Sequence, residues 1–336
     1  MNSPVTPIHF DKPKKNRTAV IVLSILLAIS VLFSLFFAFL FFVSAISDSE
    51  DEGLDGLPYE EYVGVLHIEG TISSADTTSL LYSGDSIYSQ EYILTAIDAL
   101  QNDENNKGIL LYIDTPGGEV YATDEVYTAL LEYKTVTKRP IYAYFASYAC
   151  SGGYYIAMAA DEIYAHRMST TGSIGVTYGT HIDLSGLCEK LGIGVQDISS
   201  GDNKAMGSYF APLTEEQIAI YESQLDECYG YFVDVVEAGR GLSEDEVKAV
   251  ADGRTYTAKQ AKDLSLIDGI GEYEDYAASV SSRLGNAVLH DLSYAVDYTD
   301  LLYSLGYSAN GNASEIEAVL SAIKPLSGVL VYYSGR

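Results

Sequence analysis

The sequence predicts an α/β fold, a layered sheet built from alternating strands and helices. Apolar runs of strand length alternate with segments whose apolar residues recur at helical spacing, and glycine pairs follow two of these runs. Of the 336 residues, 48% are hydrophobic, which is ample for one large folded domain. These observations favour a folded domain over a disordered chain.

A charge-free apolar stretch near the N-terminus predicts a membrane anchor. Residues 18–46 carry no charge, and about 20 apolar residues suffice to cross a bilayer. The basic residues of 1–17 precede the stretch and acidic residues follow it, which predicts a cytoplasmic N-terminus and an extracytoplasmic body. A cleaved signal peptide is the alternative, but its apolar region is usually shorter, about 7 to 15 residues.

The net charge of −28 makes nucleic acid an unexpected partner, because such a surface repels phosphate backbones. Cys150, Cys188 and Cys228 are scattered and odd in number, so they do not form the disulfide framework of a small secreted domain. The sequence contains no CxxC or HExxH motif, and its histidines are far apart. We therefore expect neither a metal nor a cofactor.

Beyond an acidic linker at 47–60, strand and helix patterns follow one another along the chain. Expected strands cover 62–72, 108–115, 140–146, 162–166 and 194–199. Expected helices cover 86–103, 120–136, 184–191, 213–238, 243–252, 257–266 and 272–284, and one more begins near 151. The segment 286–336 has no clear pattern and is rich in tyrosine.

Two glycine pairs follow consecutive strands of the predicted sheet, Gly117-Gly118 and Gly152-Gly153. Because binding sites of open α/β sheets lie at the carboxyl ends of strands, we expect both loops to face one crevice. Glycine lets a backbone N–H approach a ligand closely, and two such donors can form an oxyanion hole. Ordinary tight turns are the alternative for either pair alone.

Ser151 precedes a predicted helix, where a serine is most often only an N-cap. It becomes a candidate nucleophile if a base can take its proton. Lys204 and His166 are both candidates for that base, and their spacing leaves both open. Cys150 is the rival nucleophile, but side chains point in different directions at a strand-to-helix junction, so we expect Cys150 to be a small buried residue.

Five segments together resemble the membrane-anchored signal peptide peptidase A family, also called protease IV, within the Clp protease and crotonase fold group. They are "DTPGGEV", "ACSGGYYIAMAADEIYA", "TGSIGV", "SGDNKAMGS" and "VEAGRGLSEDEVKAVADGRTYTAKQAKDLSLIDGIG", in the family's order over roughly residues 61–282. The resemblance implies a Clp protease/crotonase-like layered fold of repeated ββα units, with an N-terminal transmembrane helix. Among the departures from the family's pattern, Thr115 stands where its glycine loop usually has serine, and Cys150 stands where alanine is usual.

Carried over by motif, the resemblance implies a Ser/Lys dyad. The nucleophile falls on Ser151, the general base on Lys204, and the serine that orients this lysine on Ser173. The oxyanion loop falls on Gly117 and Gly118, together with the Gly152 amide. The resemblance thus selects Lys204 over His166 as the base.

The resemblance further implies a serine endopeptidase that degrades cleaved signal peptides and other short apolar peptides at the outer face of the cytoplasmic membrane. Serine and lysine meet across protomers in this family, so we expect a homo-oligomer with shared sites. The expected layout is a cytoplasmic tail, anchor, linker, peptidase domain and C-terminal extension, at 1–17, 18–46, 47–60, 61–285 and 286–336. A non-catalytic scaffold of the same fold and a crotonase-type acyl-CoA enzyme are the alternatives.

Overall fold

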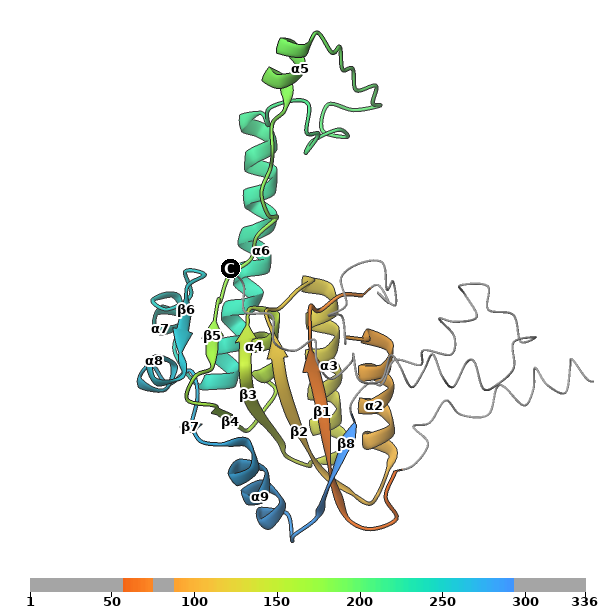
Figure 1. The fold of residues 1–336 in the computed structure, drawn as a ribbon, viewed down its shortest axis with the longest axis vertical. Coiled ribbons are helices and arrows are strands. Elements are labelled where there is room, and N and C mark those ends of the chain that lie inside the picture. The colour runs from red at the N-terminus through yellow and green to blue at the C-terminus, as the bar shows by residue number, and fades with distance from the viewer. Residues whose placement is uncertain (1–56, 75–87, 293–336) are drawn as a thin grey trace, which may run out of the picture. The chain divides into compact units, whose positions relative to one another are not determined.

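The structure is a computed structural model that describes residues 57–74 and 88–292 (Figure 1). Its strands are β1 (Tyr62–Glu69), β2 (Asn106–Thr115), β3 (Ile141–Cys150), β4 (Glu162–Ala165), β5 (Thr170–Gly172), β6 (Thr255–Thr257), β7 (Gly269–Ile270) and β8 (Val288–Leu292). Its helices are α2 (Gln90–Asn102), α3 (Val120–Thr137), α4 (Gly152–Ala157), α5 (Ser185–Leu191), α6 (Glu215–Arg240), α7 (Glu244–Lys248), α8 (Ala258–Asp263) and α9 (Tyr273–Arg283).

The strands form one mixed sheet, which confirms the predicted α/β class. The strand order is β6-β5-β3-β2-β1-β8. Off this path, β4 pairs with the N-terminal half of β3, and β7 pairs with β4. Every described pair is parallel except β5 with β6. The loops after β2 and β3 therefore leave the sheet at the same edge, as expected for parallel neighbours.

Helices cover both faces of the sheet, and the alternation of side chains along β1 shows how. Leu66 and Ile68 belong to the larger core, which α2, α3, α4 and α6 cover. Val63 and Val65 belong to a smaller core on the opposite face, where α9 contributes Tyr276, Ala277 and Val280. The period of two along a strand produces this division.

Strand β8 comes from the segment in which the sequence shows no pattern. Val288–Leu292 pairs in parallel with β1, from Tyr62 to Leu66. The sheet thus continues beyond residue 285, and its edge next to β1 is formed by this late strand (Figure 1).

Residues 175–231, which we call the arm, contribute no buried side chain. The arm holds α5 and the N-terminal part of α6, and the buried residues of α6 begin only at Phe232. It is held by contacts of its own: the Leu184 N–H donates to Tyr209 O at 2.7 Å. Many of its apolar side chains are exposed, among them Tyr178, Ile182, Leu187, Leu191, Ile193, Ile198 and Tyr209.

One predicted strand of the arm is wrong. Residues 194–199 form no strand, and each of them is exposed. An apolar alternation makes a strand only where a neighbouring strand supplies hydrogen-bond partners, and none lies beside this segment among the described residues.

The predicted membrane anchor, residues 18–46, lies outside the described residues. Within 57–74 and 88–292, no helix is long and apolar enough to cross a membrane.

Candidate active site

Ser151 lies in a strained turn between β3 and α4. Its φ of 51° and ψ of −117° are rarely adopted by a residue with a side chain. The turn is held because the Ser151 N–H donates to Gly172 O at 2.8 Å and its carbonyl accepts from the Tyr155 N–H at 2.9 Å. The Ser151 hydroxyl does not cap α4, so the N-cap alternative finds no support in this geometry.

The glycine loop after β2 packs directly against this turn. A Cβ atom on Gly117 would lie 2.8 Å from both the amide nitrogen of Gly152 and the Cβ of Ser151. On its other side the loop pairs with Ile72, whose N–H donates to Gly117 O at 3.1 Å and whose carbonyl accepts from the Glu119 N–H at 2.9 Å. The two glycine loops predicted to face one crevice therefore do lie side by side.

The amide groups of this region divide into engaged and available donors. The Gly117 N–H donates to the hydroxyl of Thr115 at 3.0 Å, and the φ of +101° at Gly117 is one that glycine tolerates best. Within the described residues, the N–H groups of Gly118 and Gly152 have no acceptor. Both residues line the same pocket as Ser151, so their N–H groups are the candidate oxyanion donors.

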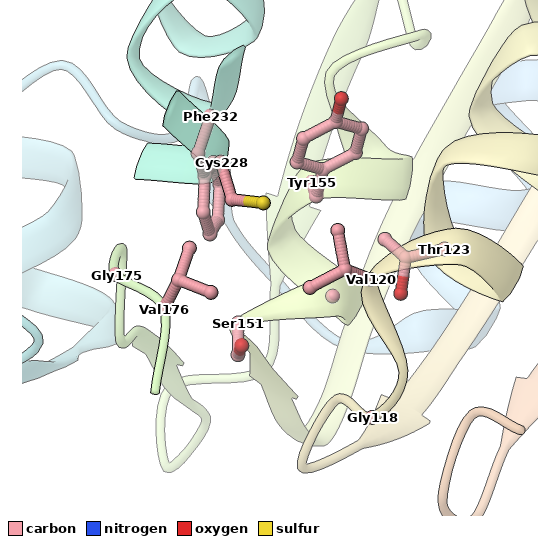
Figure 2. Close-up of a pocket in the computed structure, with 10 residues that line it drawn as sticks. Gly118, Val120, Thr123, Ser151, Tyr155, Gly175, Val176, Cys228 and Phe232 are labelled. Carbon is pink, nitrogen blue, oxygen red and sulfur yellow. The ribbon is translucent and has the colours of Figure 1, made fainter. Parts of the chain in front are cut away.

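The pocket beside Ser151 has mostly apolar walls and an empty volume of about 310 Å³. Figure 2 shows Phe232 and Cys228 of α6 on one side of the pocket, with Val176 next to Phe232 and Val120 of α3 on the opposite side. The remaining lining residues are Gly118, Thr123, Ser151, Gly152, Tyr155 and Gly175.

Tyr155 fixes the geometry of this pocket through two contacts. Its hydroxyl donates to Asp124 at 2.6 Å, and its ring packs edge-on against Phe232 with centroids 5.1 Å apart. Burial and this hydrogen bond raise the pKa of Tyr155 above its ordinary value of 10, so the phenol stays neutral at physiological pH.

Ser173 lies next to the residue that holds Ser151 in place. It directly follows Gly172, has a φ of 52°, and donates its N–H to Arg254 O at 2.8 Å. Ser173 itself is half-buried and does not line the pocket, although Gly175 and Val176 of the same segment do.

Lys204 lies in the arm, away from Ser151 of the same chain. Its neighbour Asn203 donates to the carboxylate of Glu216 at 3.0 Å, in the first turn of α6. The pocket residue Cys228 lies twelve residues further along this helix, a rise of about 18 Å at 1.5 Å per residue. The Lys204 side chain is exposed, and one chain alone does not bring it to Ser151.

The two rival residues lie outside the pocket. His166 follows β4 and lies 3.6 Å from the carboxylate of Glu272. Cys150 is 5% exposed, as expected for a small buried residue, and its thiol donates to Thr170 O at 3.4 Å. Burial raises the pKa of Cys150, which disfavours the nucleophilic thiolate.

The walls of the pocket were not predictable from the sequence. Thr123, Tyr155, Cys228 and Phe232 belong to ordinary helical patterns, and nothing in their spacing indicates a site. The tertiary fold brings α6 to the crevice, and this approach leaves no local signal.

Comparison with known proteins identifies the family. The model of peptidase family S49 matches residues 134–286, and that of ClpP-like SDH-type serine proteinases matches 80–182. A candidate protease of Methanocaldococcus jannaschii is 34% identical over 246 residues, which are 69% of this chain and 77% of that protein. The chain belongs to peptidase family S49.

A candidate signal peptide peptidase SppA of Enterococcus faecium is 38% identical over 219 residues, which are 65% of this chain and 62% of that relative's length. A ClpP1 mutant of Listeria monocytogenes matches 63% of this chain and 92% of its own, with a TM-score of 0.42 and 16% identity. Membership in family S49 makes the chain a serine peptidase by class. All pocket residues fall within the two matched stretches.

Proposed function

We propose that this protein is a membrane-anchored serine endopeptidase with a Ser/Lys dyad, and that it degrades cleaved signal peptides and other short apolar peptides. The observation that carries the proposal is the placement of Ser151, which occupies a strained turn at an apolar pocket with the Gly118 and Gly152 amides beside it. This arrangement offers a nucleophile, two oxyanion donors and room for a substrate side chain.

The reaction is acyl transfer to Ser151 followed by hydrolysis. Neutral Lys204 accepts the hydroxyl proton while the serine oxygen attacks the scissile carbonyl, and the resulting oxyanion accepts hydrogen bonds from the Gly118 and Gly152 amides. The leaving amine takes the proton from Lys204, and water then attacks the ester in a second step of the same kind. The Gly117 N–H donates to the hydroxyl of Thr115. Gly117 therefore shapes the loop and is not one of the two oxyanion donors.

Lys204 reaches Ser151 from a neighbouring copy of the chain in this proposal. An exposed lysine has a pKa near 10.4 and is almost fully protonated at neutral pH, so a base role requires that Lys204 be buried. The arm that carries Lys204 exposes many apolar side chains, which a second copy can cover. A homo-oligomer would bury the amine, bring it to Ser151, and allow Ser173 to orient it.

Substrate class and location follow from the anchor and the pocket. Residues 18–46 would hold the enzyme in the cytoplasmic membrane, with 1–17 inside and the linker, peptidase domain and C-terminal extension outside. At that surface the apolar pocket would meet signal peptides released during export. The names of relatives, such as signal peptide peptidase SppA of Enterococcus faecium, support the same substrate.

Cleavage of a synthetic signal peptide by the detergent-solubilised full chain tests the proposal. Ser151→Ala and Lys204→Ala should each abolish turnover, whereas His166→Ala and Cys150→Ala should retain it. An active Lys204→Ala variant together with an inactive His166→Ala variant would overturn the Ser/Lys mechanism. Failure of the wild type to cleave any peptide would favour the non-catalytic scaffold.

A further inference from the structure

The pocket beside Ser151 has one buried polar atom in its wall that lacks a hydrogen-bond partner. This atom is the hydroxyl oxygen of Thr123, in the first turn of α3. Thr123 is 4% exposed, and its hydroxyl neither donates to nor accepts from any described residue. Buried hydroxyls in folded proteins are nearly always paired, so an orphan in a pocket wall indicates a partner that arrives with the ligand.

The other walls offer little competition for a polar ligand group. Val120, Val176 and Phe232 are apolar, and the Tyr155 hydroxyl already donates to Asp124. Cys228 is a free, half-buried thiol whose sulfur points into the pocket in Figure 2, but a thiol is a weak hydrogen-bond donor and acceptor. Apart from Ser151 itself, Thr123 is therefore the strongest hydrogen-bonding side chain available there.

A hydrogen bond from Thr123 to a ligand requires its hydroxyl to turn from its present position toward the pocket. It now faces Gly152, as its position 2.5 Å from the site of a Cβ atom there shows. A threonine in a helix uses two rotamers at χ1. Rotation of χ1 from one rotamer to the other moves the hydroxyl to a position that the methyl group or the hydrogen of Cβ held before. In either position it can both donate and accept one hydrogen bond.

We propose that Thr123 determines specificity: the pocket receives the substrate side chain next to the scissile carbonyl and selects a short side chain with a hydroxyl, such as serine, over an alkyl group of the same size. This inference rests on the proposed function. A site that can pair with a hydroxyl disfavours the analogue that lacks it, because its own polar group is then left buried and unpaired.

The first experiment compares two peptides that differ only in the residue before the cut, serine or α-aminobutyrate, whose side chains have nearly the same size. For the full chain in detergent, we expect kcat/KM to be about fivefold to tenfold higher for the serine peptide. Thr123→Val should bring this ratio to about one, because valine matches threonine in shape and lacks the hydroxyl. Thr123→Ser is the matched control and should keep the preference.

The second experiment measures occupancy of the pocket without catalysis. In Ser151→Ala, the serine peptide should slow alkylation of Cys228 by a small thiol reagent, measured by mass spectrometry. Cys188, a half-buried thiol of α5 in the arm, serves as the reference whose alkylation should continue. The α-aminobutyrate peptide should protect Cys228 only at higher concentration.

The outcomes separate this inference from the proposed function. Cleavage of both peptides at equal rates, or a serine preference that survives Thr123→Val, would overturn the role of Thr123 and leave the peptidase assignment intact. Unchanged alkylation of Cys228 at saturating peptide would overturn the pocket assignment. Absence of any cleavage by the wild type would instead count against the proposed function. Urea unfolding of Thr123→Val with a midpoint close to that of the wild type would show that this variant is folded.

Discussion

The side chain of Thr123 occupies the space that a Cβ atom on Gly152 would need. A Cβ atom on Gly152 would lie 2.5 Å from Oγ1 and 3.3 Å from Cγ2 of Thr123, and both distances are shorter than ordinary van der Waals contacts. The first turn of α3 therefore approaches the start of α4 only because residue 152 is glycine. Ser151 immediately precedes this contact, so the contact also supports the strained turn at the candidate nucleophile.

Gly152→Ala should destabilise the protein by about 1–3 kcal/mol, the usual cost of overpacking. Thr123→Ala in the same chain should recover much of this loss, because it removes both close atoms and leaves only Cδ1 of Ile72 at 3.1 Å. We expect a coupling free energy of about 1 kcal/mol or more in a double-mutant cycle measured by urea unfolding.

Gly153→Ala is the matched control for this cycle. A Cβ atom there would meet Cγ2 of Thr115 at 2.5 Å and has no close contact with Thr123. Thr123→Ala should therefore not rescue Gly153→Ala. Strictly additive effects of Gly152→Ala and Thr123→Ala would contradict the steric account.

The sequence predicted the central sheet because its signal is local. The apolar runs of β1, β2 and β3 and the helical periods of α2 and α3 lie close to the expected ranges. The glycine loops after β2 and β3 were expected to share a crevice, since parallel neighbours end at one edge, and they do. Chain topology alone was sufficient for that part of the candidate site.

The rest depended on long-range packing. The strands β6 and β7 are only three and two residues long, too short to give a periodic signal. Residues 194–199 have an apolar pattern but no strand to pair with, so that predicted strand was wrong. The wall formed by Cys228 and Phe232 arises where α6 reaches the sheet, and the placement of Lys204 in the arm, away from Ser151, likewise leaves no local signal.

The ion pair of Arg240 with Asp268 should stabilise the fold at neutral pH. The guanidinium donates to both carboxylate oxygens, at 2.8 and 3.0 Å, and the Ile163 N–H donates to the same carboxylate at 2.7 Å. Burial alone would raise the pKa of Asp268, but these hydrogen bonds outweigh it and hold the pKa below 3.8. We expect Asp268→Asn to cost about 1–3 kcal/mol at pH 7.

The pH dependence of this cost has a definite sign. A carboxylate whose pKa is lower in the folded than in the unfolded chain stabilises the protein at pH values above its unfolded-state pKa. This stabilisation is lost as the pH falls through its folded-state pKa. The difference between wild type and Asp268→Asn in urea unfolding should therefore shrink as the pH falls below about 3.8. Asp263→Asn, which breaks an exposed pair with Lys259, should change stability by less than about 0.5 kcal/mol. A cost of Asp268→Asn that grows in acid would contradict this assignment.

Asp114 should show the opposite pH dependence. Burial, with a smaller contribution from the charge of Glu69, raises its pKa above 3.8 against the opposing N–H donors of Tyr148 and Ser147. Its charged form is thus less favourable in the folded than in the unfolded chain, a cost that is present at neutral pH and disappears in acid. Asp114→Asn keeps an oxygen that can accept from Tyr148, a bond of 2.9 Å in the wild type.

We therefore expect Asp114→Asn to stabilise the protein by a few tenths to about 1 kcal/mol at pH 7, with the gain vanishing toward pH 4. Asp114→Ala is the control: it removes the acceptor as well, so it should destabilise at both pH values. Urea unfolding at pH 4 and pH 7 measures both effects. A loss of stability in Asp114→Asn that is larger at pH 7 than at pH 4 would refute the assigned direction.

Subunits that lack Ser151 should complement subunits that lack Lys204, if each site takes its serine from one copy and its lysine from the next. In one chain the Lys204 loop is tied to Glu216, far along α6 from the pocket residue Cys228. Co-expression of Ser151→Ala with Lys204→Ala in equal amounts would leave both groups intact at about a quarter of the sites of a randomly mixed closed ring. Cleavage of a signal peptide should thus recover to about a quarter of the wild-type rate, although each variant alone is inactive.

Co-expression of Ser151→Ala with the Ser151→Ala/Lys204→Ala double variant is the matched control, because it supplies no intact serine and should stay inactive. Inactive mixed rings of the first pair would instead mean that Ser151 and Lys204 act within one chain, which would require the arm to fold back onto the sheet.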